Sequence, residues 1–266
     1  YRVAEHRRMS VSGQADGKFA GVKSVMEASL ANGADLGASF CATKDGETVI
    51  DIWGGHTGPD KARSWERDTI VNVYSTTKTM TALTALLLAD RGVFDLHDKV
   101  AKFWPEFAAE GKADVTIAQL LSHSSGLSGW KERLQREDLY DWSKCTDLLA
   151  RQAPFWAPGT APGYHALTQG YLVGEVIRRA TGKTVGSVFK QEIADPLGAD
   201  FHIGLPASED ARVAELVPPP VAVDAQASSE LQRNMATNPG IDVGETAKRE
   251  WRGAEIPAAG GTGNAR

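Results

Sequence analysis

The 266-residue chain has few of the features that mark several large classes of protein. Its only two cysteines, Cys41 and Cys145, are far apart and lack a metal-type spacing, which predicts buried thiols in a reducing compartment rather than a disulfide framework. Positive charge is not in excess, since the 29 lysines and arginines are outnumbered by 34 aspartates and glutamates. The formal net charge of −5 gives no general attraction to nucleic acid or to an anionic membrane. This balance favours an enzyme that acts on small molecules, with no nucleic-acid partner.

Long apolar runs are missing as well. The longest, Ala82 to Ala89, is far too short to span a bilayer, so we expect no membrane partner. The first ten residues are rich in charge and have no apolar centre, unlike a signal peptide. We therefore expect a cytoplasmic protein. A secreted or periplasmic protein that had already lost its leader would begin in the same way, and that alternative stays open.

Two kinds of catalytic signature are also absent. No Gly-x-Ser-x-Gly elbow occurs, so the chain gives no sign of an α/β-hydrolase serine. Neither a His-x-x-x-His pattern nor a cysteine pair indicates a metal site. We expect neither a metal nor a cofactor.

Hydrophobic periodicity predicts strands near the front of the chain. A helix is expected over residues 22–31, followed by strands over residues 36–43 and 48–53. The tip Lys44–Glu47 between these two strands is typical of a hairpin. A sheet that consists mainly of one hairpin is only marginally stable in isolation.

Helical patterns dominate the middle of the chain. They are expected over residues 75–91, from a capping box at Thr116–Gln119, and over residues 171–180 and 184–194. The helix over 75–91 is the most apolar, and its predicted apolar side consists of Met80, Leu83, Leu86 and Leu87. Beyond Pro218 the pattern fades, and we expect no helix or strand over residues 257–266.

These elements predict a mixed α/β (α+β) fold, in which an antiparallel sheet is flanked by helices and accompanied by an all-helical subdomain. We expect residues 1–75 to form the N-terminal part of the α/β domain, with its helix and hairpin. Residues 76–215 are expected to form the mostly helical subdomain. Residues 216–266 are expected to be a loop-rich return toward the α/β domain.

The pattern Ser-x-x-Lys occurs three times, starting at Ser75, Ser128 and Ser187. Nucleophilic chemistry needs the lysine one helical turn after the serine, on the same face of a buried helix. The first turn of that helix favours negative charge on the attacking oxygen, and desolvation lowers the pKa of the lysine. Only Ser75 follows an extended segment and opens an apolar helix, with Lys78 just inside it. On the pattern alone, however, a helix-capping serine with an incidental lysine is the more frequent case.

Six blocks of sequence, in order, support the first interpretation. They resemble the penicillin-recognising serine hydrolases, and within them the β-lactamase-like esterases called family VIII carboxylesterases. The blocks are Val73–Thr79 (VYSTTKT), Arg91–Leu96 (RGVFDL), Val100–Phe107 (VAKFWPEF), Gln119–Leu127 (QLLSHSSGL), Trp156–Gly159 (WAPG) and Gly163–Gly174 (GYHALTQGYLVG).

The resemblance implies a β-lactamase/transpeptidase-like fold and a serine esterase that hydrolyses small carboxylic esters through an acyl-serine. It makes Ser75 the nucleophile, Lys78 its activating partner and Tyr164 the general acid or base. A phenol beside a lysine ammonium has a lowered pKa, so a phenolate becomes accessible. Taken alone, Tyr164 would be a core or interface aromatic.

We also expect His165, Ala166, Tyr74 and Trp130 to line the substrate pocket. Class C β-lactamases have an asparagine where this chain has Ala166, and alanine cannot bind a β-lactam side-chain amide. This favours simple esters. A β-lactamase, DD-peptidase or acyltransferase on the same scaffold is the alternative, and a catalytically silent binding domain is the alternative from another class.

The resemblance also concerns residues outside this sequence. In the family, one oxyanion-hole N–H belongs to the nucleophile and the second to a strand near the C-terminus. We expect that strand, and other C-terminal strands of the sheet, to be missing here. The expected partners are a small ester and additional polypeptide of the same protein, and an oligomer stays open. His123, in the fourth block, is implied to be structural.

Overall fold

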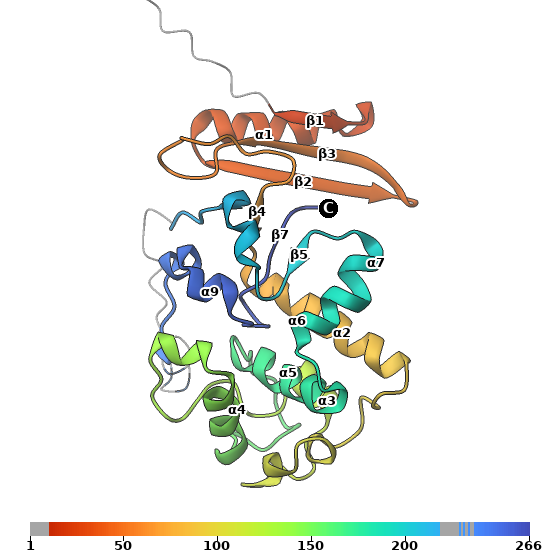
Figure 1. Cartoon of the computed structure of the whole chain (residues 1–266), viewed down its shortest axis with the longest axis vertical. Coiled ribbons are helices and arrows are strands. Elements are labelled where there is room, and N and C mark those ends of the chain that lie inside the picture. The colour runs from red at the N-terminus through yellow and green to blue at the C-terminus, as the bar shows by residue number, and fades with distance from the viewer. Residues whose placement is uncertain (1–10, 219–228, 230, 232–233, 235–236) are drawn as a thin grey trace, which may run out of the picture. The chain divides into compact units, whose positions relative to one another are not determined.

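The structure is a computed structural model that describes residues 11–218, 229, 231, 234 and 237–266 (Figure 1). These residues form two compact units. Unit 1 contains residues 11–71, 208–217 and 263–266, and unit 2 contains residues 72–207 and the described part of 218–262. Each unit has its own hydrophobic core. Most of the described residues after Pro218 therefore group with the helices of unit 2.

Unit 1 is built on an antiparallel sheet of three strands in the order β1-β3-β2. The strands are β1 (Ser12–Ala15), β2 (Gly37–Lys44) and β3 (Glu47–Gly55). Asp45 and Gly46 have φ values of 53° and 84°, which are the positive values that a tight hairpin turn between twisted strands requires. The predicted hairpin is confirmed.

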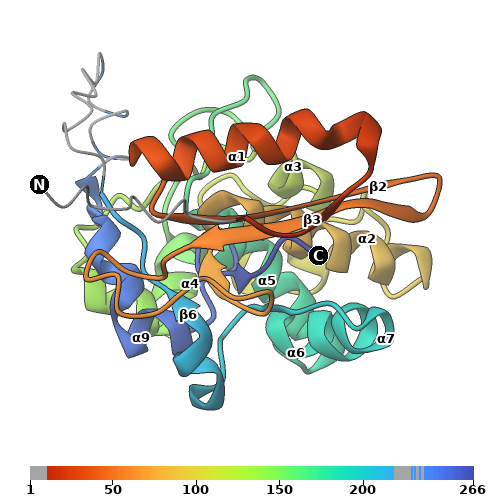
Figure 2. The same ribbon diagram turned by 90° about the horizontal axis from the view of Figure 1, so that it is seen from above.

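Helix α1 (Ala20–Asn32) lies along the three-stranded sheet of unit 1 (Figure 2). Its buried Leu30 packs with Val11, Ile50 and Ile52 in the core of this unit. The helix ends at Gly33, whose φ of 78° is the left-handed conformation typical of a glycine after a helix. The predicted helix over residues 22–31 is therefore confirmed, with three further residues at its ends.

Strand β1 corrects the expectation that the sheet consists mainly of one hairpin. It pairs with β3 from Ser12 opposite Trp53 to Ala15 opposite Ile50. Its sequence, Ser-Gly-Gln-Ala, has no alternating apolar side chains, so periodicity gave no sign of it.

Two later segments of the chain also belong to unit 1. Strand β4 (Ile70–Asn72, whose last residue falls in unit 2) pairs in parallel, through Ile70 and Val71, with β6 (Val213–Ala214). The carboxylate of Asp51 on β3 accepts hydrogen bonds from Arg67 and from Arg266. Because this carboxylate is nearly buried, the pairing with two guanidinium groups offsets the cost of burying its charge.

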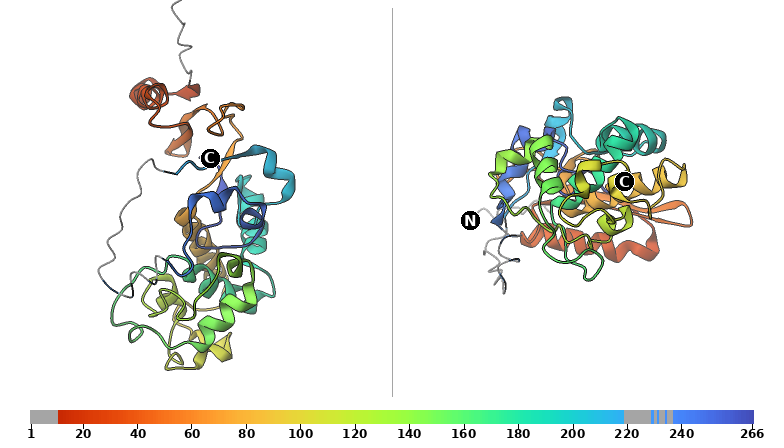
Figure 3. Two further views of the ribbon diagram at one scale, coloured as in Figure 1. Left: turned by 90° about the vertical axis from the view of Figure 1, so that its left-hand side faces the viewer. Right: turned by 90° about the horizontal axis from the view of Figure 1, so that it is seen from below.

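Unit 2 contains the α-helices other than α1, and two short strands, whose bounds the structure gives (Figures 1 and 3). They are α2 (Thr77–Asp90), α3 (Ile117–Leu121), α4 (Trp142–Arg151), α5 (Thr168–Thr181), α6 (Val185–Phe189), α7 (Asp195–Leu197) and α9 (Arg249–Gly253), with β5 (Phe201–His202) and β7 (Thr262–Gly263, whose second residue falls in unit 1). Helix α5 is the centre of this unit, since it contacts α2, α3, α4 and α6. The predicted capping box at Thr116 and Gln119 is present at α3. The expectation of no strand over residues 257–266 is wrong at β7.

The mixed α/β fold class predicted from the sequence is confirmed, with an antiparallel sheet and a mostly helical part. In the described ranges, no helix combines the length and the apolar character needed to cross a bilayer. Helix α2 differs from the prediction in which of its sides is buried. Its buried positions include Thr77, Thr81 and Thr84, whereas Leu83 and Leu86 are 44% and 48% exposed.

Lys112 in unit 2 is fully buried, and its Nζ donates to the carbonyl oxygens of Ala109 (2.8 Å) and Gln152 (2.5 Å). Burial lowers the pKa of Lys112 from 10.5 to about 8. Between those values the unfolded chain binds more protons than the folded chain, so the free energy of unfolding rises with pH in that window. We predict that the free energy of unfolding of Lys112→Met does not rise with pH in this way. In the wild type the rise due to Lys112 amounts to at most about 1.4 kcal/mol per pH unit.

Denaturant titrations of wild type and Lys112→Met from below pH 8 to above pH 10.5 measure the effect. Groups that titrate in both proteins cancel in the difference between them. Identical pH dependence of the two unfolding free energies would contradict the prediction.

Candidate active site

Ser75 occupies an exposed position in a short 3-10 turn, Tyr74–Thr76, that leads directly into α2. The preceding residue, Tyr74, has a φ of 43°, in the left-handed region that side-chain-bearing residues rarely adopt. Its N–H donates to Asn72 Oδ1 at 3.3 Å, and its carbonyl accepts from Thr77 Oγ1 at 2.5 Å. These bonds hold a sharp bend that places the Ser75 side chain at the surface in front of the helix.

Lys78 lies one helical turn further on and is only 7% exposed. Its Nζ lies 3.1 Å from Ser75 Oγ, 2.7 Å from the Ala166 carbonyl oxygen and 2.9 Å from the Ala258 carbonyl oxygen. Burial lowers the pKa of Lys78, against an opposing effect of Tyr164. A lysine and a serine on the same helical face within hydrogen-bond distance are what the one-turn spacing predicts.

The surroundings of Lys78 Nζ decide where its lone pair points. The two carbonyls can only accept hydrogen bonds, so each requires an N–H from the amine. A neutral amine has two N–H groups, and both are then used by Ala166 and Ala258. The lone pair is then left for the hydroxyl groups beside the amine, those of Ser75 and Tyr164, and at 3.1 Å from Ser75 Oγ it can accept the serine proton.

Tyr164 contacts the same oxygen. Its hydroxyl donates to Ser75 Oγ at 2.6 Å, and its ring centroid lies 4.8 Å from Lys78 Nζ. Partial burial acts to raise the pKa of Tyr164, but the hydrogen bonds to Ser75 and Lys78 and the lysine charge outweigh it, so the pKa is lowered. Ser75 Oγ therefore has two groups beside it that can take or return a proton.

The Ala258 carbonyl reaches Lys78 because the backbone of residues 257–258 lies directly on α5. A Cβ at Gly170 of that helix would come within 2.4 Å of the Ala258 backbone nitrogen, so only glycine fits there. Two buried threonines of α2, Thr77 and Thr81, bond to residues 257 and 261 of the same stretch of chain. Thr81 Oγ1 donates to the Pro257 carbonyl at 2.7 Å, and Thr77 Oγ1 accepts from the Gly261 N–H at 2.8 Å. The polar buried side of α2 thus serves the site.

His165 is fully buried beside this cluster. Its Nε2 accepts from the Leu127 N–H at 3.3 Å and lies 2.8 Å from Ser125 Oγ, while its Nδ1 contacts the Gly163 carbonyl and therefore carries the proton. Burial lowers the pKa of His165 to about 4, so it is neutral near pH 7. We expected His165 to line the pocket, and the structure instead makes it a buried support of the loop.

Trp130 requires the same correction. It is 1% exposed, its Nε1 donates to the Cys145 carbonyl at 3.0 Å, and its ring packs against Tyr171. It therefore belongs to the helical core. Of the other two expected pocket residues, Tyr74 is half-buried next to Ser75, and Ala166 contributes its backbone carbonyl to Lys78.

The two competing Ser-x-x-Lys serines have different surroundings. Ser128 is 2% exposed and its Oγ has no hydrogen-bond partner, while Lys131 is exposed. Ser187 Oγ bonds to Thr184, and Lys190 pairs with Asp195 at the surface. Of the three serines, only Ser75 has a bond to the lysine of its own motif.

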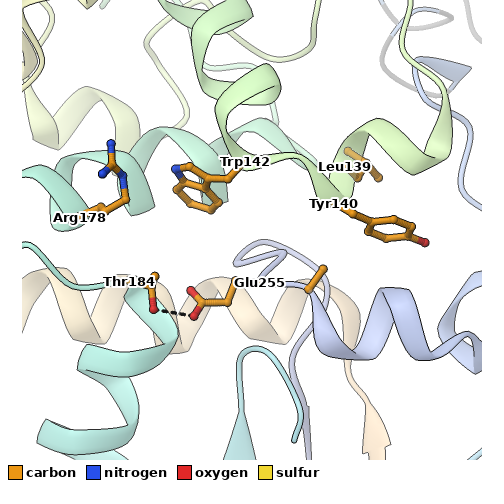
Figure 4. A pocket seen from close by; sticks show the side chains of 7 residues that line it. Leu139, Tyr140, Trp142, Arg178, Thr184 and Glu255 are labelled. Carbon is orange, nitrogen blue, oxygen red and sulfur yellow. Dashed lines mark hydrogen bonds between the residues drawn. The ribbon is translucent and has the colours of Figure 1, made fainter. Parts of the chain in front are cut away.

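A cavity of about 200 Å³ in unit 2 contains none of Ser75, Lys78 and Tyr164 (Figure 4). It is lined by Leu139, Tyr140, Trp142, Arg178, Thr184, Ala254 and Glu255. Both carboxylate oxygens of Glu255 are occupied at the start of α6, by Thr184 Oγ1 at 2.6 Å and the Gly186 N–H at 3.0 Å. We place the candidate site at Ser75 because its hydroxyl lies within hydrogen-bond distance of both the Lys78 amine and the Tyr164 phenol. Over the described residues, no group of three or more His, Cys, Asp or Glu could hold a metal ion.

With this geometry in view, comparison with known proteins identifies the class. The beta-lactamase family model matches residues 22–266, so the chain belongs to the beta-lactamase family. Esterase/beta-lactamase LipL of Mycobacterium tuberculosis is 34% identical over 268 aligned positions, which cover 96% of this chain and 62% of that protein. The chain thus spans about three fifths of the length of LipL.

Two solved structures are similar over 96% of this chain and 68% of their own. A family VIII carboxylesterase is 45% identical with a TM-score of 0.89, and a penicillin-binding protein homolog from Caulobacter crescentus is 37% identical with a TM-score of 0.83. These similarities confirm the resemblance to penicillin-recognising hydrolases that the six sequence blocks indicated.

Proposed function

We propose that this chain carries the active site of a serine hydrolase that cleaves small carboxylic esters through an acyl-serine intermediate. The observation that carries the proposal is the pair of proton-exchanging groups at Ser75 Oγ, Lys78 Nζ at 3.1 Å and Tyr164 OH at 2.6 Å. Similarity to an esterase/beta-lactamase and to a family VIII carboxylesterase supports it.

In the first half of the reaction, Ser75 Oγ attacks the ester carbonyl carbon and forms a C–O bond. Its proton moves to neutral Lys78 or to the Tyr164 phenolate, the two groups within hydrogen-bond distance. The leaving alcohol oxygen then takes a proton back as its bond to carbon breaks. Water repeats the sequence on the acyl-serine, which releases the acid and restores Ser75.

The position of Ser75 at the entrance to α2 supplies electrostatic support. The first-turn N–H groups and the dipole of this 14-residue helix favour negative charge at its N-terminus. A backbone N–H that donates to the oxyanion of the tetrahedral intermediate is worth about 10²–10³ in kcat. We assign one such donor to Ser75 itself.

Residue 166 favours simple esters over β-lactams. In this position Ala166 offers a methyl side chain, and its carbonyl is already bonded to Lys78. One missing hydrogen bond to a polar substrate group costs about 0.5–3 kcal/mol. A β-lactamase or DD-peptidase is therefore the weaker alternative. Acyl transfer to an alcohol uses the same acyl-serine and differs only in the final acceptor, and a silent binding domain would form no acyl-serine at all.

The test is exposure of the protein to a fluorophosphonate probe, followed by intact mass and peptide mapping. We expect a single adduct on Ser75, present in Ser128→Ala and absent in Ser75→Ala. On the same preparation, p-nitrophenyl acetate should be hydrolysed far more efficiently than benzylpenicillin. An adduct on Ser128 or Ser187 would reject the nucleophile, no adduct at all would favour the binding domain, and equal efficiency on penicillin would favour a β-lactamase.

A second prediction concerns the phenol of Tyr164. Tyr164→Phe keeps the ring but removes the hydroxyl that lies 2.6 Å from Ser75 Oγ. We expect kcat for p-nitrophenyl acetate to fall by about 10²-fold or more, the range for loss of a positioned acid or base. Tyr140→Phe, whose hydroxyl bonds weakly to Glu245 at 3.4 Å, is the matched control and should retain activity. Unchanged turnover in Tyr164→Phe would mean that the phenol only packs.

A further inference from the structure

The side chain of Tyr164 has little regular structure around it to fix its position. It is 48% exposed and sits in a stretch, residues 153–167, that contains no helix or strand. A catalytic group must be held within about 0.5 Å of its productive place, and a half-exposed side chain on an irregular segment has little packing to hold it. The backbone around Tyr164 therefore has to be fixed by other contacts.

One residue makes the contacts on both sides of Tyr164. The N–H of Gly163 donates to the His123 carbonyl at 2.9 Å, and the N–H of His165 donates to His123 Nδ1 at 3.0 Å. The imidazole also lies against the phenol ring, with 4.9 Å between the ring centroids. Tyr164 is thus bracketed by two hydrogen bonds and one ring contact, all from His123.

The backbone of His123 is itself in an uncommon conformation. Its φ is 60°, in the left-handed region where residues other than glycine are rare. The neighbouring bonds from the Ser122 N–H to the Ala118 carbonyl and from the Ser124 N–H to the Gln119 carbonyl anchor this bend to the end of α3. When a residue other than glycine is held in this strained conformation, the surrounding contacts usually require it. Here the bend allows the carbonyl and the imidazole of His123 to bond to residues on both sides of Tyr164.

The bond to His165 requires a particular state of the imidazole. His123 Nδ1 accepts a hydrogen bond, so its proton must be on Nε2 in the neutral ring. Burial, together with the charge of Lys78, lowers the pKa of His123, which favours that neutral state.

We propose that His123 is a positioning residue that holds the Tyr164 phenol against Ser75 Oγ. The proposal rests on the proposed function, because it assigns a purpose to the geometry of the same site. His123 does not touch the reacting oxygen in this arrangement and acts only through Tyr164.

The test compares His123→Asn with His123→Leu. Asparagine places an acceptor, Oδ1, at the same distance along the side chain as Nδ1, and it tolerates positive φ. Leucine has a similar branched shape but no acceptor. We expect His123→Leu to lower kcat for p-nitrophenyl acetate by about tenfold or more with little change in KM, the pattern of a lost transition-state contribution. His123→Asn should recover most of the kcat.

Rates are divided by the concentration of active sites titrated with the fluorophosphonate, so partial unfolding does not imitate the effect. His97→Leu, which changes an exposed histidine, is the control and should leave kcat unchanged. Wild-type kcat in His123→Leu, or an equal loss in His123→Asn, overturns the proposal. If His123→Leu does not fold, the kcat of His123→Asn is the test: a value near that of the wild type supports the proposal, and a loss of about tenfold or more overturns it. Failure of the wild type to be labelled would instead overturn the proposed function.

Discussion

The amine of Lys78 is the point on which the site depends, because three segments that are distant in sequence meet at one nitrogen. Ser75 precedes it by a single turn, Ala166 comes from the segment before α5, and Ala258 comes from the segment after α9. A buried amine is costly unless its N–H groups have acceptors. The two carbonyls meet that need, and they leave the remaining lone pair of the neutral amine for the hydroxyl groups of Ser75 and Tyr164. Folding of unit 2 thus also brings together the groups that we propose to activate Ser75.

The features that the sequence predicts correctly are local ones. Helix α1, the β2–β3 hairpin with its Asp45-Gly46 turn, and the capping box of α3 each depend on residues a few positions apart, and the structure contains all of them. The Ser75–Lys78 spacing is of the same kind, since a helix places both side chains on one face. Family resemblance, rather than local pattern, pointed to Tyr164.

What the sequence could not predict depends on contacts between distant segments. Every residue has a carbonyl, so nothing in the side chain of Ala258 indicates that its oxygen binds Lys78. The burial of His165 and Trp130 could not be predicted either, because an aromatic residue suits a core and a pocket wall equally well. The buried threonines of α2 reverse the usual expectation of an apolar buried face, and the hydroxyls of Thr77 and Thr81 bind the segment 257–261. The one residue in the sequence related to this contact is Gly170, because its lack of a side chain makes room for the backbone of Ala258.

The central claim is that the neutral amine of Lys78 can accept the Ser75 proton, with the Tyr164 phenolate as the second possible acceptor. The most direct measurement is the pH dependence of the rate constant with which a fluorophosphonate acylates Ser75. It should be made in Tyr164→Phe, because the phenol and the amine otherwise titrate as a coupled pair. With Lys78 as the base, the rate should rise to a plateau with a midpoint below 10.5, the ordinary lysine value, since burial lowers the pKa of this amine. A midpoint at or above 10.5, or a profile that Lys78→Met leaves unchanged, would contradict the account.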